Sequence, residues 1–142
     1  MADPWAQAIY TRLSGDATLV AMLGTRGIPA RPAIFTFWPA PADAVAALYV
    51  VAAGNVSNQP QDTKTTLGRT VVRDVFVYGP NVGNVTAIEA AAERIRGLLH
   101  RYCLTVTGYR VYIAVADGPI VAPTGDDMVG RVVTVTWTCE HT

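Results

Sequence analysis

The sequence has little charge and very little cysteine. Only 15% of its 142 residues are Asp, Glu, Lys or Arg, and 11 basic residues balance 11 acidic ones. No run of Lys or Arg occurs, so the basic footprint of a nucleic-acid-binding protein is missing. We do not expect its two cysteines, Cys103 and Cys139, to form a disulfide, because the cytoplasm is reducing. Nucleic acid is therefore not expected as a partner.

Long hydrophobic runs are missing as well. The longest, Ala44–Ala53, is far shorter than the roughly 20 residues of a membrane-spanning helix. The N-terminus has no basic region followed by an apolar stretch, so we expect neither a secretory signal nor a membrane partner. The length fits one domain over residues 1–142. Because 51% of the residues are hydrophobic and few are charged, we expect apolar surface that is buried by self-association.

One polar segment, Gly54–Gly68, separates the apolar stretches Leu48–Ala53 and Val71–Tyr78. Hairpin loops usually have about 2–5 residues, and loops beyond about 12–15 residues are mostly functional or disordered. This segment contains no His, Cys or aromatic residue, so it has little equipment for catalysis. We therefore predict a hairpin arm at residues 54–68 that contacts another protein chain. Its candidate contact residues are Asn58, Gln59, Gln61, Asp62, Lys64, Thr65 and Thr66.

Helical spacing of apolar residues predicts a first helix from Pro4 to Leu13. Asp16 is a suitable N-cap for a second short helix that Gly24 ends, which gives a helical hairpin. Thr86 and Glu89 have the spacing of a capping box and predict the start of a long amphipathic helix. Its apolar stripe comprises Ile88, Ala91, Ala92, Ile95, Leu98, Leu99 and Tyr102.

Five stretches rich in apolar, β-branched or aromatic residues predict strands around these helices. A short edge strand is expected within Ala33–Trp38, and a long hairpin from Leu48–Ala53 and Arg69–Tyr78. A second hairpin joins Tyr109–Ala116 to Val129–Thr138 through the loop Asp117–Met128. In its last strand two sets of residues alternate, which predicts one core face and one largely threonine face: Arg131, Val133, Val135 and Trp137 against Val132, Thr134, Thr136 and Thr138. The expected class is α+β, with a mostly antiparallel sheet of four to five strands, an N-terminal helical hairpin and one long amphipathic helix packed on the sheet.

Two short pairs have the residue types of a zinc site. His100 and Cys103 would share a helix face, and Cys139 and His141 would share a strand face. Neither spacing is a common zinc-finger pattern, and Cys is often simply a small buried apolar residue. We therefore expect no metal and no other cofactor.

Other polar clusters have simpler explanations than catalysis. Asp117, Asp126 and Asp127 are acidic, yet Asp is also a common turn residue and no His or Lys lies close to them in the sequence. Residues 79–84 precede a helix but lack the P-loop ending. Arg73 and Asp74 interrupt an apolar strand and are candidates for a paired contact across an interface, although outward alternation on a two-faced sheet is the simpler interpretation. No catalytic residue is expected.

In their order along the chain, these pieces resemble the tail terminator, or tail completion, proteins of long-tailed bacteriophages and gene transfer agents. The resemblance covers most of the chain and depends on order and spacing. The matching features are the N-terminal helix, residues 14–24 continuing to Ile28, the proline-broken Pro29–Pro41, the strand at Tyr49–Val51, the polar arm, the strand Val71–Tyr78, the helix Ala87–Leu99 and the strand Gly130–Val135. The Pro- and Ala-rich stretch Pro39–Ala47 departs from the family's pattern.

The resemblance implies a small α+β structural subunit of the virion. Such proteins form a homohexameric ring on the head-proximal end of the tail, stop growth of the tail tube and present a surface for head joining. The implied partners are further copies of the chain, the tail tube protein and the head–tail connector protein. Two alternatives stay open: a neck or head-closure connector, and a small ligand-binding or metal-dependent enzymatic domain that uses Asp117, Asp126 and Asp127.

Overall fold

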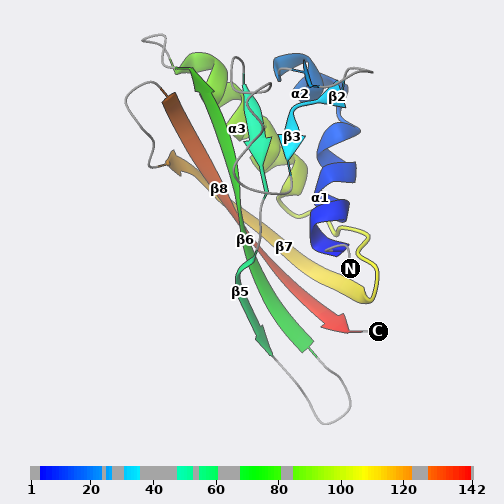
Figure 1. The fold of residues 1–142 in the computed structure, drawn as a ribbon. Coiled ribbons are helices and arrows are strands. Elements are labelled where there is room, and N and C mark those ends of the chain that lie inside the picture. The colour runs from blue at the N-terminus through cyan, green and yellow to red at the C-terminus, as the bar shows by residue number, and fades with distance from the viewer. Residues whose placement is uncertain are drawn as a thin grey trace.

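The computed structural model describes residues 4–23, 25–26, 31–35, 48–52, 55–60, 68–80, 85–122 and 128–141. The chain folds as an α+β domain in which three helices lie on one face of a long twisted sheet (Figure 1). Among the described residues, no helix is both long and apolar enough to cross a membrane. The elements are α1 (Pro4–Ser14), α2 (Ala17–Met22), β1 (Thr25–Arg26), β2 (Arg31–Pro32), β3 (Ile34–Phe35), β4 (Tyr49–Val51), β5 (Asn55–Pro60), β6 (Gly68–Pro80), α3 (Thr86–Leu99), β7 (Tyr109–Val121) and β8 (Met128–His141).

The main sheet has six strands in the order β3-β4-β6-β8-β7, and β5 pairs with β6 beside this path. Strands β3 and β4 are parallel, whereas the other pairs are antiparallel. The predicted sheet of four to five strands is therefore one or two strands too small, and the observed sheet is mixed rather than wholly antiparallel. A parallel pair needs a crossover of about a dozen residues or more, and residues 36–48 lie between β3 and β4. Strands β1 and β2 form a separate two-stranded sheet.

The sixth strand comes from the polar segment that was predicted to be an arm without regular structure. Residues Asn55–Pro60 form β5, which pairs with β6 from Asn55 opposite Arg73 to Pro60 opposite Arg69. Strand pairing uses backbone groups, so a polar sequence with low strand propensity can still be held by a long neighbour. Gly54 and residues 61–67 of the predicted arm lie outside the described part of the chain.

The predicted helices are confirmed with small changes in their ends. Asp16 caps α2 by accepting a hydrogen bond from the Leu19 N–H at 2.9 Å. The capping box is wrong, because α3 has Val85 as its N-cap without a side-chain cap bond, and Glu89 instead accepts from Arg131 at 2.8 Å. The apolar stripe of α3 is buried as predicted up to Leu99. Tyr102 lies beyond the end of the helix and is 40% exposed.

The main core lies between the helices and the inner face of the sheet. Strand β8 alternates as predicted, with Val133, Val135 and Trp137 fully buried and the intervening threonines partly exposed. Strand β7 continues through the predicted loop as far as Val121, so Asp117 pairs with Thr134 rather than lying in a turn between strands. Residues 123–127 of that loop lie outside the described part of the chain. A smaller aromatic core on the outer face joins Phe35, Tyr49, Val51, Tyr78, Ala33, Ala122 and Val132.

Candidate assembly interface

The predicted contact residues of the arm fall into two groups. Asn58 and Gln59 belong to β5, and the Gln59 side chain is exposed. The other five, Gln61, Asp62, Lys64, Thr65 and Thr66, lie outside the described residues. In the part of the chain that the structure describes, β5 has β6 as its only strand partner. The structure therefore offers the outer edge of β5 for pairing with another chain, at the end of the sheet furthest from α3 (Figure 1).

Arg73 and Asp74 lie on opposite faces of β6. Asp74 is partly exposed on the outer face and accepts a hydrogen bond from the Thr134 hydroxyl at 2.7 Å. Arg73 shares its side of the strand with Val71 and Val75 and is completely buried. Outward alternation was therefore correct for Asp74 and wrong for Arg73. Consecutive strand residues point to opposite faces, and the register set by the neighbouring valines sends Arg73 inward.

The outer face of the β6–β8–β7 region carries mostly small and β-branched side chains. Thr134 and Thr136 of β8 lie opposite Asp74 and Val72 of β6, and all four side chains are partly exposed. Across β8 on the same face, β7 exposes Ile113 by 56% and Val115 by 47%. Every residue that α1, α2 and α3 contribute to a core belongs to the main core, on the opposite face of the sheet. The threonine face of β8 was predicted, whereas the exposure of Ile113 and Val115 on β7 was not, because the prediction for that strand assigned no residue to a face.

The outer edge of β7 is contacted by the backbone and side chains of residues 100–103, which follow α3. The Arg101 N–H donates to the Ala114 carbonyl at 2.8 Å, and the Ala116 N–H donates to Nδ1 of His100 at 3.1 Å. The thiol of Cys103 lies 3.6 Å from the Tyr112 carbonyl. Edge strands that keep unpaired backbone groups invite further strands, and such contacts prevent that. Between Tyr112 and Ala116, β7 is therefore not a pairing edge, whereas β5 is.

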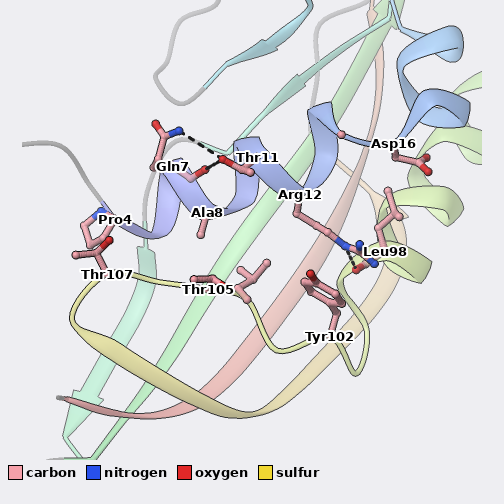
Figure 2. Close-up of a pocket in the computed structure, with 12 residues that line it drawn as sticks. Pro4, Gln7, Ala8, Thr11, Arg12, Asp16, Leu98, Tyr102, Thr105 and Thr107 are labelled. Carbon is pink, nitrogen blue, oxygen red and sulfur yellow. Dashed lines mark hydrogen bonds between the residues drawn. The ribbon is translucent and has the colours of Figure 1, made fainter.

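A cavity of about 430 Å³ lies between α1 and the segment that links α3 to β7 (Figure 2). Buried Ala8, Leu98 and Leu104 give it an apolar floor, and exposed Thr11 and Thr105 belong to its polar rim. Its described lining includes no His, Cys or Lys, and Asp16 is its only carboxylate. The cavity therefore has no nucleophile paired with a base, which an acyl- or phosphoryl-transfer site would need.

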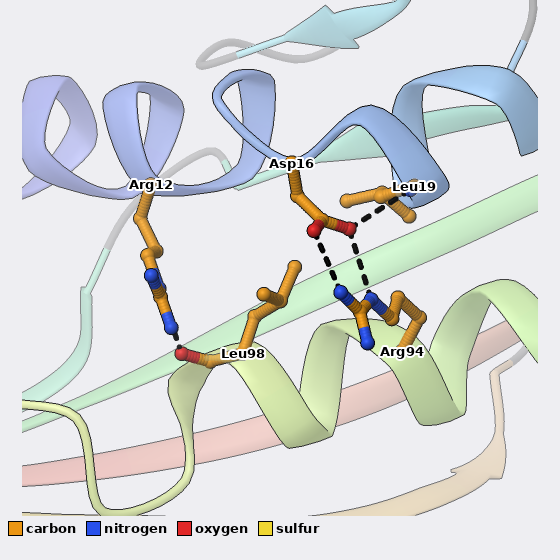
Figure 3. A network of polar contacts seen from close by, with 5 residues as sticks. All are labelled: Arg12, Asp16, Leu19, Arg94 and Leu98. Carbon is orange, nitrogen blue, oxygen red and sulfur yellow. Dashed lines mark hydrogen bonds and ion pairs between the residues drawn. The ribbon is translucent and has the colours of Figure 1, made fainter.

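Polar contacts around this cavity hold the helical hairpin against α3 (Figure 3). Nε and Nη2 of Arg94 donate to the two carboxylate oxygens of Asp16 at 2.9 and 2.7 Å. Mainly through this pairing, the pKa of Asp16 falls to about 2. Nearby, Nε of Arg12 donates to the Leu98 carbonyl at 3.0 Å, and its guanidinium carbon lies 3.6 Å from the centroid of the Tyr102 ring.

The cysteine and histidine pairs that were weighed as a zinc site lie in different surroundings. Cys139 is buried on β8, its burial raises the pKa of its thiol, and its Sγ lies 3.6 Å from the Arg69 carbonyl. Cys103 is exposed and free, His100 accepts from the backbone of β7, and the ring of His141 contacts Tyr109. Among the described residues, no three His, Cys, Asp or Glu side chains come together as a metal site. Asp126 and Asp127 lie outside the described residues.

Comparison with known proteins gives a structural relationship only. No protein-family model matches the chain, and no curated protein matches it. Among solved structures, a chain of the "Virion of native gene transfer agent (GTA) particle" superposes with a TM-score of 0.77 at 22% identity, over 95% of this chain and 93% of that chain. A second chain, at 20% identity over 99% of this chain and 94% of its own length, has a TM-score of 0.48 and carries no argument. At this identity, the first superposition shows that the two chains share a fold.

Proposed function

We propose that this chain is a structural virion protein without catalytic activity. The observation that carries the proposal is the superposition with a chain of a gene transfer agent virion, which extends over nearly all of both chains. The lining of the cavity supports it, because the described residues there provide no nucleophile–base pair. A fold alone does not define a function, so the proposal also depends on the surfaces that the chain presents.

More specifically, we propose a tail terminator that forms a homohexameric ring on the head-proximal end of the tail tube. A ring needs a heterologous interface, in which one surface of a subunit meets a different surface of the next. The open edge of β5 and the hairpin arm of residues 54–68 are suited to one side of this interface. Arg73 is buried on the inner face of β6, so Asp74, on the outer face, is the residue of this pair that is accessible to a partner. The tail tube protein and the head–tail connector protein are the proposed partners on the two faces of the ring.

The arm can be removed without disturbing the strands that bear it. Pro60 and Arg69 are paired residues, so replacing residues 61–68 by Asn-Gly joins them through a two-residue hairpin turn. We expect this variant to fold with a Tm close to that of the parent chain but to lose ring formation. The matched control replaces residues 123–127, at the opposite end of the sheet, by Gly-Ser-Gly-Ser-Gly.

The measurements are native mass spectrometry and negative-stain electron microscopy, with and without purified tail tube protein. Hexamers of the parent and of the control, together with monomers of the arm variant, would support the proposal. A parent chain that stays monomeric at high concentration and does not bind tail tubes would refute the terminator function. Rings that bind a head connector but never a tail tube would favour the neck protein instead.

A further inference from the structure

The cavity beside α1 contains a cation that the fold holds in place without using all of its hydrogen-bonding capacity. Arg12 is fixed at two points, by the bond from its Nε to the Leu98 carbonyl and by the face of the Tyr102 ring. Among the described residues, the bond from Nε to Leu98 is the only hydrogen bond of the Arg12 side chain, so neither of its Nη atoms has an acceptor there. A guanidinium held in this way has lost most of its side-chain freedom and still has N–H groups to donate.

The acidic residue that lines the cavity is already paired with another cation. Asp16 also lines the cavity, but Arg94 binds both of its carboxylate oxygens, and the Leu19 N–H binds one of them as well. Asp16 and Arg94 thus cancel each other, and Arg12 leaves the cluster with one net positive charge. An apolar floor beside that charge lowers the local dielectric and strengthens its attraction for an anion.

The remaining walls would suit a small polar ligand. The Thr105 and Thr107 side chains line the cavity across from α1 (Figure 2). Gln7 also belongs to its lining, but its amide donates to the Thr11 hydroxyl at 3.4 Å. A volume of about 430 Å³ falls within the range of small-ligand sites, roughly 300–1,000 Å³. A planar group with two acceptor oxygens matches the fork of an Arg side chain best.

We propose that this cavity binds a carboxylate, with the free N–H groups of Arg12 donating to its two oxygens and the threonines contacting the attached chain. The carboxylate comes either from an acidic side chain of another protein molecule or from a small carboxylic acid in solution. This site lies apart from the arm, because its residues belong to α1, the turn after α1, the end of α3 and the segment after α3.

The first experiment titrates the parent chain with glutarate and, separately, with uncharged glutaramide of the same shape, followed by ¹⁵N NMR spectra. We expect glutarate, but not glutaramide, to shift the signals of Thr105, Thr107 and the Arg12 Nε–H. Arg12→Gln should weaken glutarate binding at least about tenfold, since hydrogen bonds to charged groups are worth more than neutral ones. Arg110→Gln is the matched control, because Arg110 is exposed on β7 and lies outside the cavity.

The second experiment identifies the source of the carboxylate. Self-association of the parent, Arg12→Gln and Arg110→Gln is compared by sedimentation at equal concentrations. If Arg12→Gln associates more weakly while Arg110→Gln does not, the carboxylate belongs to another copy of the chain. If both variants associate like the parent and the parent binds glutarate, the carboxylate belongs to a small acid. Equal responses to glutarate and glutaramide, together with unchanged association of Arg12→Gln, would overturn the proposal. If Arg12→Gln does not fold, the comparison of the two ligands on the parent chain still decides the matter.

Discussion

Close packing of α3 on the sheet predicts opposite outcomes for the same substitution at two neighbouring alanines. Ala92 has no exposed surface and lies in the main core, whereas Ala90, two residues earlier on the same helix, is exposed. Because α3 packs on β6, β7 and β8, a small residue at position 92 sets how closely the helix approaches the strands. We predict that Ala92→Leu destabilises the fold and that Ala90→Leu does not.

The expected size of the effect follows from the burial. Leu adds three carbon atoms to a site that is already filled, and overpacking of this kind costs about 1–3 kcal/mol. With an unfolding entropy of about 2.1 cal/mol/K per residue, a chain of 142 residues loses about 3 °C in Tm for each kcal/mol. The expected fall in Tm for Ala92→Leu is therefore about 3–10 °C. Ala90→Leu should stay within about 0.5 kcal/mol of the parent, because both residues are good helix formers and the position is exposed.

Thermal unfolding followed by circular dichroism, with urea unfolding as a second measure, tests this pair. Both variants keep the charge of the chain, so the comparison isolates volume. Equal stability of the two variants would show that α3 does not lie against the sheet as described. A destabilised Ala90→Leu beside a neutral Ala92→Leu would mean that the helix is rotated about its axis.

Two further predictions concern charged residues. The pKa of Asp16 is lowered to about 2, so its stabilising contribution is present above the unfolded value of 3.8 and is lost as the pH falls towards 2. In urea unfolding, the free energy of unfolding of Asp16→Asn should therefore fall less over that pH range than that of the control variant Glu93→Gln. Arg73 is completely buried and Asp74 only partly, so Arg73→Ala should cost about 2–5 kcal/mol and Asp74→Ala less than about 1 kcal/mol. Similar losses for both alanine variants would contradict the assignment of Arg73 to the core.

The elements that sequence reasoning placed correctly are those whose causes are local. The helix spacing from Ile88 to Leu99 repeats every three or four residues, and Asp16 needs only the next turn of backbone to act as a cap. Alternation along Val133–Trp137 likewise follows from strand geometry. These features required no knowledge of what lies on the other side of the core.

The failures share a different cause. The sequence of β5 is polar, and its strand forms because β6 is long enough to hold it. The capping box did not form, because Glu89 lies close enough to Arg131 of β8 to bind it. Arg73 faces the core because it lies on the same face of β6 as Val71 and Val75, and the register of β6 turns that face inward. In each case, a partner distant in the sequence outweighed the local preference.

The sequence by itself determined an α+β domain with a helical hairpin, an amphipathic helix and two long hairpins, because periodicity and capping are encoded within a few residues. Only the tertiary structure decided which face each strand turns inward, which sheet edge stays open and that Arg12 lines the cavity beside α1. Those features depend on register and on contacts such as that between Arg12 and Leu98, 86 positions apart in the chain. Backbone hydrogen bonds and close packing between distant segments fix such contacts, and no single segment carries their signal.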